Sequence, residues 1–166
     1  MKVILALVLM VSSQLALAGV FSSFTEREYK YRSQGRWNDN AGEKGTWTGE
    51  TTYTVVDDST LKVDGKTKIN DGDNIVEMTT TMSFKESSEG FIDVLNKDGA
   101  KVGTGYCQGP ACHYTYEETS DEGAHKVEET IKFRHHHKQF KLIGSHTAPG
   151  DAGKITAWSG RGRLVE

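Results

Sequence analysis

The sequence has few cysteines, few prolines and no long apolar run. Its 166 residues include two cysteines and two prolines. No second cysteine pair is present to complete a structural zinc site, which needs three or four ligands, and no proline-rich linker divides the chain. The apolar run at residues 3–11 is too short to span a bilayer. We therefore expect one domain that does not span a membrane.

Familiar catalytic motifs are also missing. The chain contains no Gly-x-Ser-x-Gly elbow, phosphate-binding loop, dinucleotide fingerprint or His-Glu-x-x-His pair. The carboxylate pairs Asp57–Asp58 and Glu128–Glu129 fall in a turn or alternate across an expected strand. We therefore expect a protein that is not an enzyme and that carries no cofactor and no resident metal.

No block of positive charge is present. The 20 basic and 23 acidic residues are mixed along the chain, and removal of Lys2 with a leader would leave 19 against 23, a net charge of −4. This balance argues against a nucleic-acid partner and against a basic membrane-binding surface.

The first 18 residues have the layout of a secretory signal peptide. Lys2 precedes the apolar run, and the small-x-small triplet Ala16–Ala18 ends the segment. Cleavage near Ala18 predicts a secreted or periplasmic protein. Residues 19–166, about 148 residues, then suffice for one domain with a sizeable core.

After the leader, apolar and polar residues alternate, which is the period of a β-strand. The pattern is clear in residues 46–56, 75–85, 126–133, 139–146 and 155–164. Turn-forming Gly, Asp, Asn and Pro separate such runs, and no window has a helical period. The sequence predicts about 8 to 10 antiparallel strands.

Strands with one apolar face must bury that face. Sequential hairpins do so by closing into an up-and-down barrel or by packing as a two-sheet β-sandwich. The expected strand length of about 8 to 12 residues favours the barrel. Threonine, lysine and glutamate on the opposite faces predict a water-facing exterior, whereas an outer-membrane barrel needs an apolar one.

The two cysteines lie at the ends of an expected hairpin. Residues 108–111, Gln-Gly-Pro-Ala, are turn formers, so Cys107 and Cys112 can face each other across the two strands. In an exported protein such a pair favours a disulfide, worth about 2 kcal/mol for so short a loop. A redox pair or a metal site that includes His113 is the alternative.

Two segments resemble a known family of barrels. Gly35–Trp37 and, more fully, Gly45–Glu50 ("GTWTGE") resemble the Gly-x-Trp start of lipocalin-like (calycin) barrels, among them the nitrobindin-like and related bacterial lipocalin-like domains of unknown function. The resemblance implies a barrel that holds a small apolar ligand. The chain departs from the family in having no convincing lipocalin helix and no alignable haem-binding histidine.

The expected inward faces supply the candidate ligand-binding residues, any of which can equally be core. They are Trp47, Tyr53, Met78, Met82, Phe84, Tyr114, Tyr116, Phe140, His146 and Trp158, with Phe133 beside them in the core. His146 shares the strand parity of Phe140 and Leu142, so we expect it inside the barrel near one end, where an imidazole can bind a ligand.

Two further groups of residues are expected at the surface. Residues 134–138, "RHHHK", predict a solvated turn in which His135 and His137 could share a surface metal ion. Arg161 and Arg163 lie on the face opposite Trp158, and only an inverted assignment of faces would let them meet a ligand carboxylate.

Three functions follow in order of preference. The first is an exported protein that binds a small, mostly apolar ligand inside a barrel. The second is an envelope structural or protein-interaction module with a filled core. The third is a haem- or metal-assisted enzyme. The sequence leaves the ligand and the oligomeric state open.

Overall fold

The computed structural model describes residues 19–70, 72–120, 123–148 and 154–165, and this part of the chain contains strands and no helix. The signal peptide expected at residues 1–18 lies outside it. The described residues form ten strands: β1 (Glu28–Asp39), β2 (Lys44–Asp57), β3 (Thr60–Asn70), β4 (Ile75–Ser88), β5 (Phe91–Asn96), β6 (Lys101–Gln108), β7 (Ala111–Ser120), β8 (Gly123–Arg134), β9 (Gln139–Thr147) and β10 (Ile155–Leu164).

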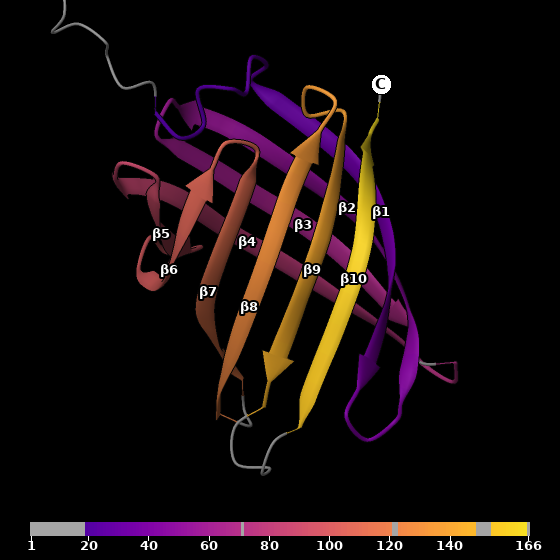
Figure 1. Ribbon diagram of the computed structural model, residues 1–166. Helices are drawn as coiled ribbons and strands as arrows, with labels where there is room; N and C mark the ends of the chain where they lie inside the picture. The colour runs from indigo at the N-terminus through magenta and orange to yellow at the C-terminus, as the bar shows by residue number, and fades with distance from the viewer. Residues whose placement is uncertain (1–18, 71, 121–122, 149–153, 166) are drawn as a thin grey trace, which may run out of the picture.

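The strands form a closed antiparallel barrel. Each strand pairs with the next along the chain, and β10 pairs with β1 from Tyr31↔Leu164 to Asp39↔Thr156 to complete the circle. Figure 1 shows β7–β10 on one side of the barrel and β2–β4 crossing behind them. The predicted up-and-down barrel is confirmed, and the alternative of a two-sheet sandwich is wrong. No described helix is long and apolar enough to cross a membrane.

The wall of the barrel is incomplete beside its two shortest strands. β4 pairs with β5 only from Met82 onward, although it pairs with β3 from Ile75. The pairing of β6 with β7 likewise stops at Gly103↔Tyr116. Among the described residues, the first half of β4 and the last part of β7 therefore have a strand neighbour on one side only.

The alternating pattern places one set of side chains inside. Leu61, Ile92 and Val94 are almost completely buried, and aromatic rings fill the space between the walls near one end. Tyr53, for example, lies 5.5 Å from Phe133 and 5.6 Å from Tyr31, ring centroid to ring centroid, with edge-to-face geometry. We call this the closed end of the barrel.

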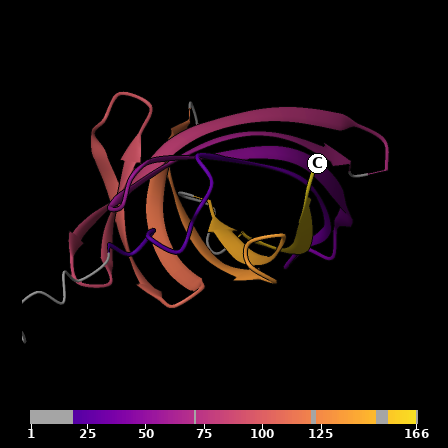
Figure 2. The ribbon, with the colours of Figure 1, turned by 90° about the horizontal axis from the view of Figure 1, so that it is seen from above.

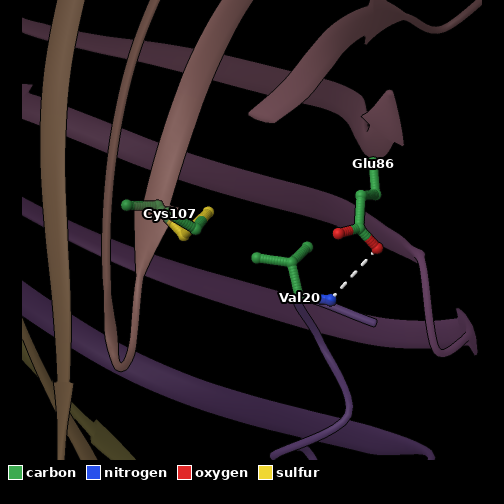
Figure 3. The surroundings of a disulfide bond; sticks show 4 residues. Val20, Glu86 and Cys107 are labelled. Carbon is green, nitrogen blue, oxygen red and sulfur yellow. Dashed lines mark hydrogen bonds between the residues drawn. A yellow bond between two sulfur atoms is a disulfide. The ribbon is translucent and has the colours of Figure 1, made fainter. Parts of the chain in front are cut away.

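A short segment before β1 covers the closed end. Residues 19–24 form turns that cross this end of the barrel, as the indigo segment in Figure 2 shows. Phe21 and Phe24 are buried in the core beneath it. The amide of Phe21 donates to the carbonyl of Asp58, and the amide of Val20 donates to Glu86 Oε2 at 3.2 Å (Figure 3). The segment thus closes one mouth of the barrel with two phenylalanines.

The disulfide expected in the β6–β7 hairpin is present. Cys107 and Cys112 are directly opposite in the register of the two strands and are bonded to each other. Both are buried in the core, and Val20 of the N-terminal segment lies beside them in Figure 3. His113, the next residue, points outward and is exposed, as strand alternation requires.

Candidate functional site

Small side chains leave room inside the barrel away from the closed end. On the inner face of β2–β4, Thr51, Gly65 and Thr80 are opposite one another in register, and Thr67 lies further along β3. They border a cavity of about 130 Å³. Its lining is Ser33, Trp47, Thr51, Tyr53, Val63, Gly65, Thr67, Thr80, Met82, Phe84, Tyr114, Tyr116, Glu129, Phe140 and Leu142.

Glu129 is the charged group of the cavity lining. It lies on β8 between the inward-facing Val127 and Ile131, so the strand aims it into the barrel. Its Oε2 accepts a hydrogen bond from the Tyr114 hydroxyl at 2.8 Å, and its Oε1 accepts one from Trp158 Nε1 at 3.2 Å. Burial raises the pKa of the Glu129 carboxyl above its ordinary value of 4.5, although both hydrogen bonds act to lower that pKa.

The other charge that acts on this carboxyl is also negative. Glu118, on the neighbouring strand β7, raises the pKa of Glu129 further. Burial is the main cause that raises the pKa of the Tyr53, Tyr114 and Tyr116 hydroxyls, and the Glu129 carboxylate raises the pKa of all three further. The cavity is therefore electronegative, and its lining mixes aromatic rings with hydroxyl groups.

Trp47 forms part of the wall because two glycines make room for its ring. A Cβ on Gly35 would lie 2.5 Å from the indole, and one on Gly160 would also collide with it. The indole therefore lies flat against β1 and β10. Its Nε1 is buried without a hydrogen-bond acceptor among the described residues, although a buried indole N–H usually has one.

Most of the predicted site residues meet at this cavity. Seven of the ten line it: Trp47, Tyr53, Met82, Phe84, Tyr114, Tyr116 and Phe140. Trp158 joins them through its hydrogen bond to Glu129. Met78 does not line the cavity and is 44% exposed, because it stands where β4 has no neighbour on the side of β5.

His146 lies on the inward face of β9 but away from the cavity lining. It is half-buried and stacks on His125 of β8, with ring centroids 4.7 Å apart. Burial and the neighbouring His125 lower the pKa of His146, and Glu118 acts to raise it. The pair lies toward the end of the barrel opposite the N-terminal segment, which we call the open end.

Sequence reasoning missed the polar part of the site. Glu129, Ser33, Thr51, Thr67 and Thr80 all line the cavity, but none was among the expected ligand-binding residues. The signal for Glu129 was present, because it shares the parity of Val127, Ile131 and Phe133. Alternation across the strand, which argued against a carboxylate pair at Glu128–Glu129, is the same fact that puts Glu129 inside.

The histidine turn differs from the expectation. His135, His136 and His137 all have positive φ values, between 51° and 65°, and this left-handed turn directs His137 back toward the core. His137 is only 8% exposed and stacks on Phe24 at 4.0 Å. The prediction of a fully solvated turn was therefore wrong for His137, and His135 and His137 do not form a shared surface site.

The remaining candidate groups lie outside the cavity. Arg161 and Arg163 are exposed, so the inverted assignment of faces is excluded. No cluster of three or more potential metal ligands occurs among the described residues. A wide hollow of about 850 Å³ at the closed end lies between residues 19–23, the β4–β5 and β6–β7 turns and residues 133–137. Turns and the covering segment form most of this hollow, and it shares no lining residue with the cavity beside Glu129.

Two solved structures share the architecture. S-type phycobiliprotein lyase CPES from Guillardia theta is 13% identical, with 82% of this chain and 87% of that chain covered and a TM-score of 0.63. Rv2717c from M. tuberculosis is 6% identical, with 89% and 98% covered and a TM-score of 0.53. No protein-family model and no curated protein matches the sequence. The likenesses show the fold alone, and it fits the lipocalin-like barrel that the Gly-x-Trp segments predict.

Proposed function

We propose that the protein is an exported binding protein that holds a small molecule inside its barrel. The observation that carries the proposal is the cavity beside Glu129, where aromatic and aliphatic side chains stand beside hydroxyl groups and one carboxyl. Small-molecule sites commonly combine an apolar lining with a few placed polar groups in this way. A barrel of this size can hold one small ligand.

The size of the cavity limits the ligand. An engineered cavity of about 150 Å³ in another protein binds benzene, so about 130 Å³ suits a molecule with a single ring or an aliphatic body of similar size. A haem group needs much more room. His146 also stacks on His125 outside the cavity lining. Both observations disfavour the haem-type alternative.

Binding without catalysis is part of the proposal. Trp158 and Tyr114 hold the Glu129 carboxyl in place from two sides. An indole N–H is a donor only, so this pairing positions an acceptor and supplies no activated nucleophile. One of the similar structures is named a lyase, so we include recovery of the unchanged ligand in the test.

Export is also proposed. It rests on the leader-like layout of residues 1–18 and on the Cys107–Cys112 disulfide, which suits an oxidising compartment. Identification of the first residue of the protein recovered from outside the cytoplasm, by mass spectrometry, tests it. We expect a chain that begins at Gly19, and an uncleaved chain retained in the cytoplasm would contradict it.

The Gly65→Leu variant tests the binding site. A Cβ at Gly65 would have no contact closer than 3.8 Å, to Thr51 Oγ1, so the backbone tolerates a side chain and the leucine enters the cavity. Lys66→Leu is the matched control, because it adds the same side chain to the exposed face of the same strand. Native mass spectrometry and ligand-observed NMR with a library of single-ring compounds measure binding to each protein.

We expect the wild type and Lys66→Leu to bind members of the library and Gly65→Leu to lose that binding, with bound compounds recovered unchanged. Equal binding by Gly65→Leu would place the ligand elsewhere. A library without any wild-type binder would contradict the proposed function and favour the protein-interaction alternative.

A further inference from the structure

No lysine or arginine that the structure describes lies inside the barrel. Every lysine and arginine that the structure describes is exposed, and this includes all of those after residue 18. No ion pair to Glu129 occurs among the described residues. The charged group that acts on the pKa of Glu129 is the Glu118 carboxylate, which is also negative. Glu129 is half-buried, and a carboxylate withdrawn from water without a cation is costly, so such a group either takes up a proton or acquires a positive partner.

The hydrogen bonds of Glu129 suit the ionised form. Trp158 Nε1 can only donate, and the Tyr114 hydroxyl donates to the other oxygen. Each carboxylate oxygen accepts one hydrogen bond from the protein and has lone-pair capacity left for a ligand. The side chain is thus held as an acceptor, and a ligand group that meets it must be a donor.

The rings of the cavity also suit a positive group. Tyr53, Tyr114, Tyr116, Trp47 and Phe140 all line it, and the faces of aromatic rings attract cations. Desolvation inside the barrel strengthens this attraction. A carboxylate ligand, by contrast, would meet Glu129, Glu118 and electron-rich ring faces, and none of the described lysines or arginines lies inside the barrel to offset the repulsion.

We propose that the ligand is a small protonated amine whose ammonium group pairs with Glu129 and whose apolar body lies against Met82, Phe140 and Leu142. The inference rests on the proposed function, since it names the ligand class of that same cavity. It predicts selection by charge, with cations preferred over neutral molecules and anions excluded.

Three probes that share one ring test the selection. Benzylamine is a cation at neutral pH, benzyl alcohol is neutral, and benzoate is an anion. Isothermal titration calorimetry, supported by the fluorescence of Trp47 and Trp158, measures the dissociation constant of each. The Glu129→Gln variant removes the charge at constant size. Glu128→Gln is the matched control, because it removes the adjacent charge on the exposed outer face.

For the wild type and Glu128→Gln we expect benzylamine to bind at least about tenfold more tightly than benzyl alcohol, which corresponds to ~1.4 kcal/mol, and benzoate not to bind. Glu129→Gln should lose this preference while its affinity for benzyl alcohol stays within about threefold of the wild-type value. Retained binding of the alcohol also shows that the variant is folded.

The outcomes separate the two proposals. If the alcohol or benzoate binds the wild type as tightly as the amine, or if Glu129→Gln keeps the preference for the amine, the amine inference fails and the cavity remains a binding site. If none of the probes binds the wild type and the compound library also gives no binder, the proposed function fails and the amine inference fails with it.

Discussion

Glu129 concentrates the unusual chemistry of this barrel in one side chain. Burial raises the pKa of its carboxyl, and so does Glu118 from β7, whereas hydrogen bonds from Tyr114 and Trp158 act in the opposite direction. The raised pKa means that ionisation is less favourable in the folded protein than in the unfolded chain. The carboxyl thus opposes folding when it is charged and has no cationic partner.

This carboxyl makes the stability of the ligand-free protein depend on pH. Because its folded pKa lies above the ordinary value of 4.5, its contribution to stability is fully present below that value and is lost as the pH rises through the folded pKa. Relative to Glu129→Gln, the free energy of unfolding of the wild type should therefore fall with rising pH. Urea unfolding at steps from pH 4 to pH 8 measures the free energy of unfolding of each protein. Subtracting one value from the other removes the effect of groups that titrate in both proteins.

A constant difference between the two proteins would show that Glu129 titrates normally. Tyr53 on β2 and Tyr114, Tyr116 and Glu118 on β7 also act on this region. The tyrosines stay neutral over this range because the ordinary pKa of the hydroxyl, 10.0, already lies above it and burial raises that pKa further. Saturating benzylamine should remove the decline, since the paired carboxylate then gains a cation.

At this scale the sequence predicts apolar wall residues better than polar ones. Trp47, Tyr53 and Met82 follow from alternation alone, because burial selects apolar side chains on one face. Glu129 breaks that rule, and only the closed barrel shows that a charged residue with inward parity has hydrogen-bond donors on two other strands. The fit of the Trp47 ring against Gly35 and Gly160 depends on strands that are distant in sequence, so no local pattern reveals it.

Among the elements, the strands and the β6–β7 hairpin follow from local signals. Cys107 and Cys112 flank a Gly-Pro turn, and hairpin register places them opposite each other. The segment of residues 19–24 has no such signal. Its two phenylalanines are three residues apart in a run without alternation, and their burial depends on the open mouth that the strands leave.

The first half of β4 should be the least protected long strand segment. From Ile75 to Thr81 it pairs with β3, but no described strand pairs with its other side. About half of the amides in residues 76–81 therefore lack a strand acceptor and should exchange with solvent orders of magnitude faster than those of β9, which has a partner on both sides. Hydrogen–deuterium exchange followed by NMR measures this.

Uniform slow exchange over residues 76–81 would contradict the prediction. It would mean that another chain or a further segment covers the edge of β4 in solution. Ile75, Val76 and Met78 are exposed there, and an exposed apolar edge is where such pairing occurs. Dilution distinguishes a second copy, because rapid exchange should return as the protein concentration falls.

For the molecule as a whole, the N-terminal segment that contributes to stability and the Glu129 carboxyl lie at different levels of the barrel. The closed end holds Phe24, which stacks on His137 and meets Phe133 and Tyr29 edge-on. Glu129 lies four residues before Phe133 on β8, a distance of ~13 Å along a strand. The covering segment and the Glu129 carboxyl therefore share no direct contact and are connected through the rings of Phe133 and Tyr53.

This separation predicts that stability and ligand affinity change independently. Phe24→Ala removes a buried ring and should lower the free energy of unfolding by about 3 to 5 kcal/mol, because the space beneath residues 19–24 cannot fully collapse against a rigid barrel. Its dissociation constant for benzylamine, measured by calorimetry below the unfolding transition, should stay within about twofold of the wild-type value.

Glu129→Gln should show the reverse, with weaker amine binding and a fold that is not destabilised at neutral pH. A loss of affinity in Phe24→Ala comparable with that in Glu129→Gln would contradict this division, and would mean that the N-terminal segment holds the cavity in shape through the aromatic core.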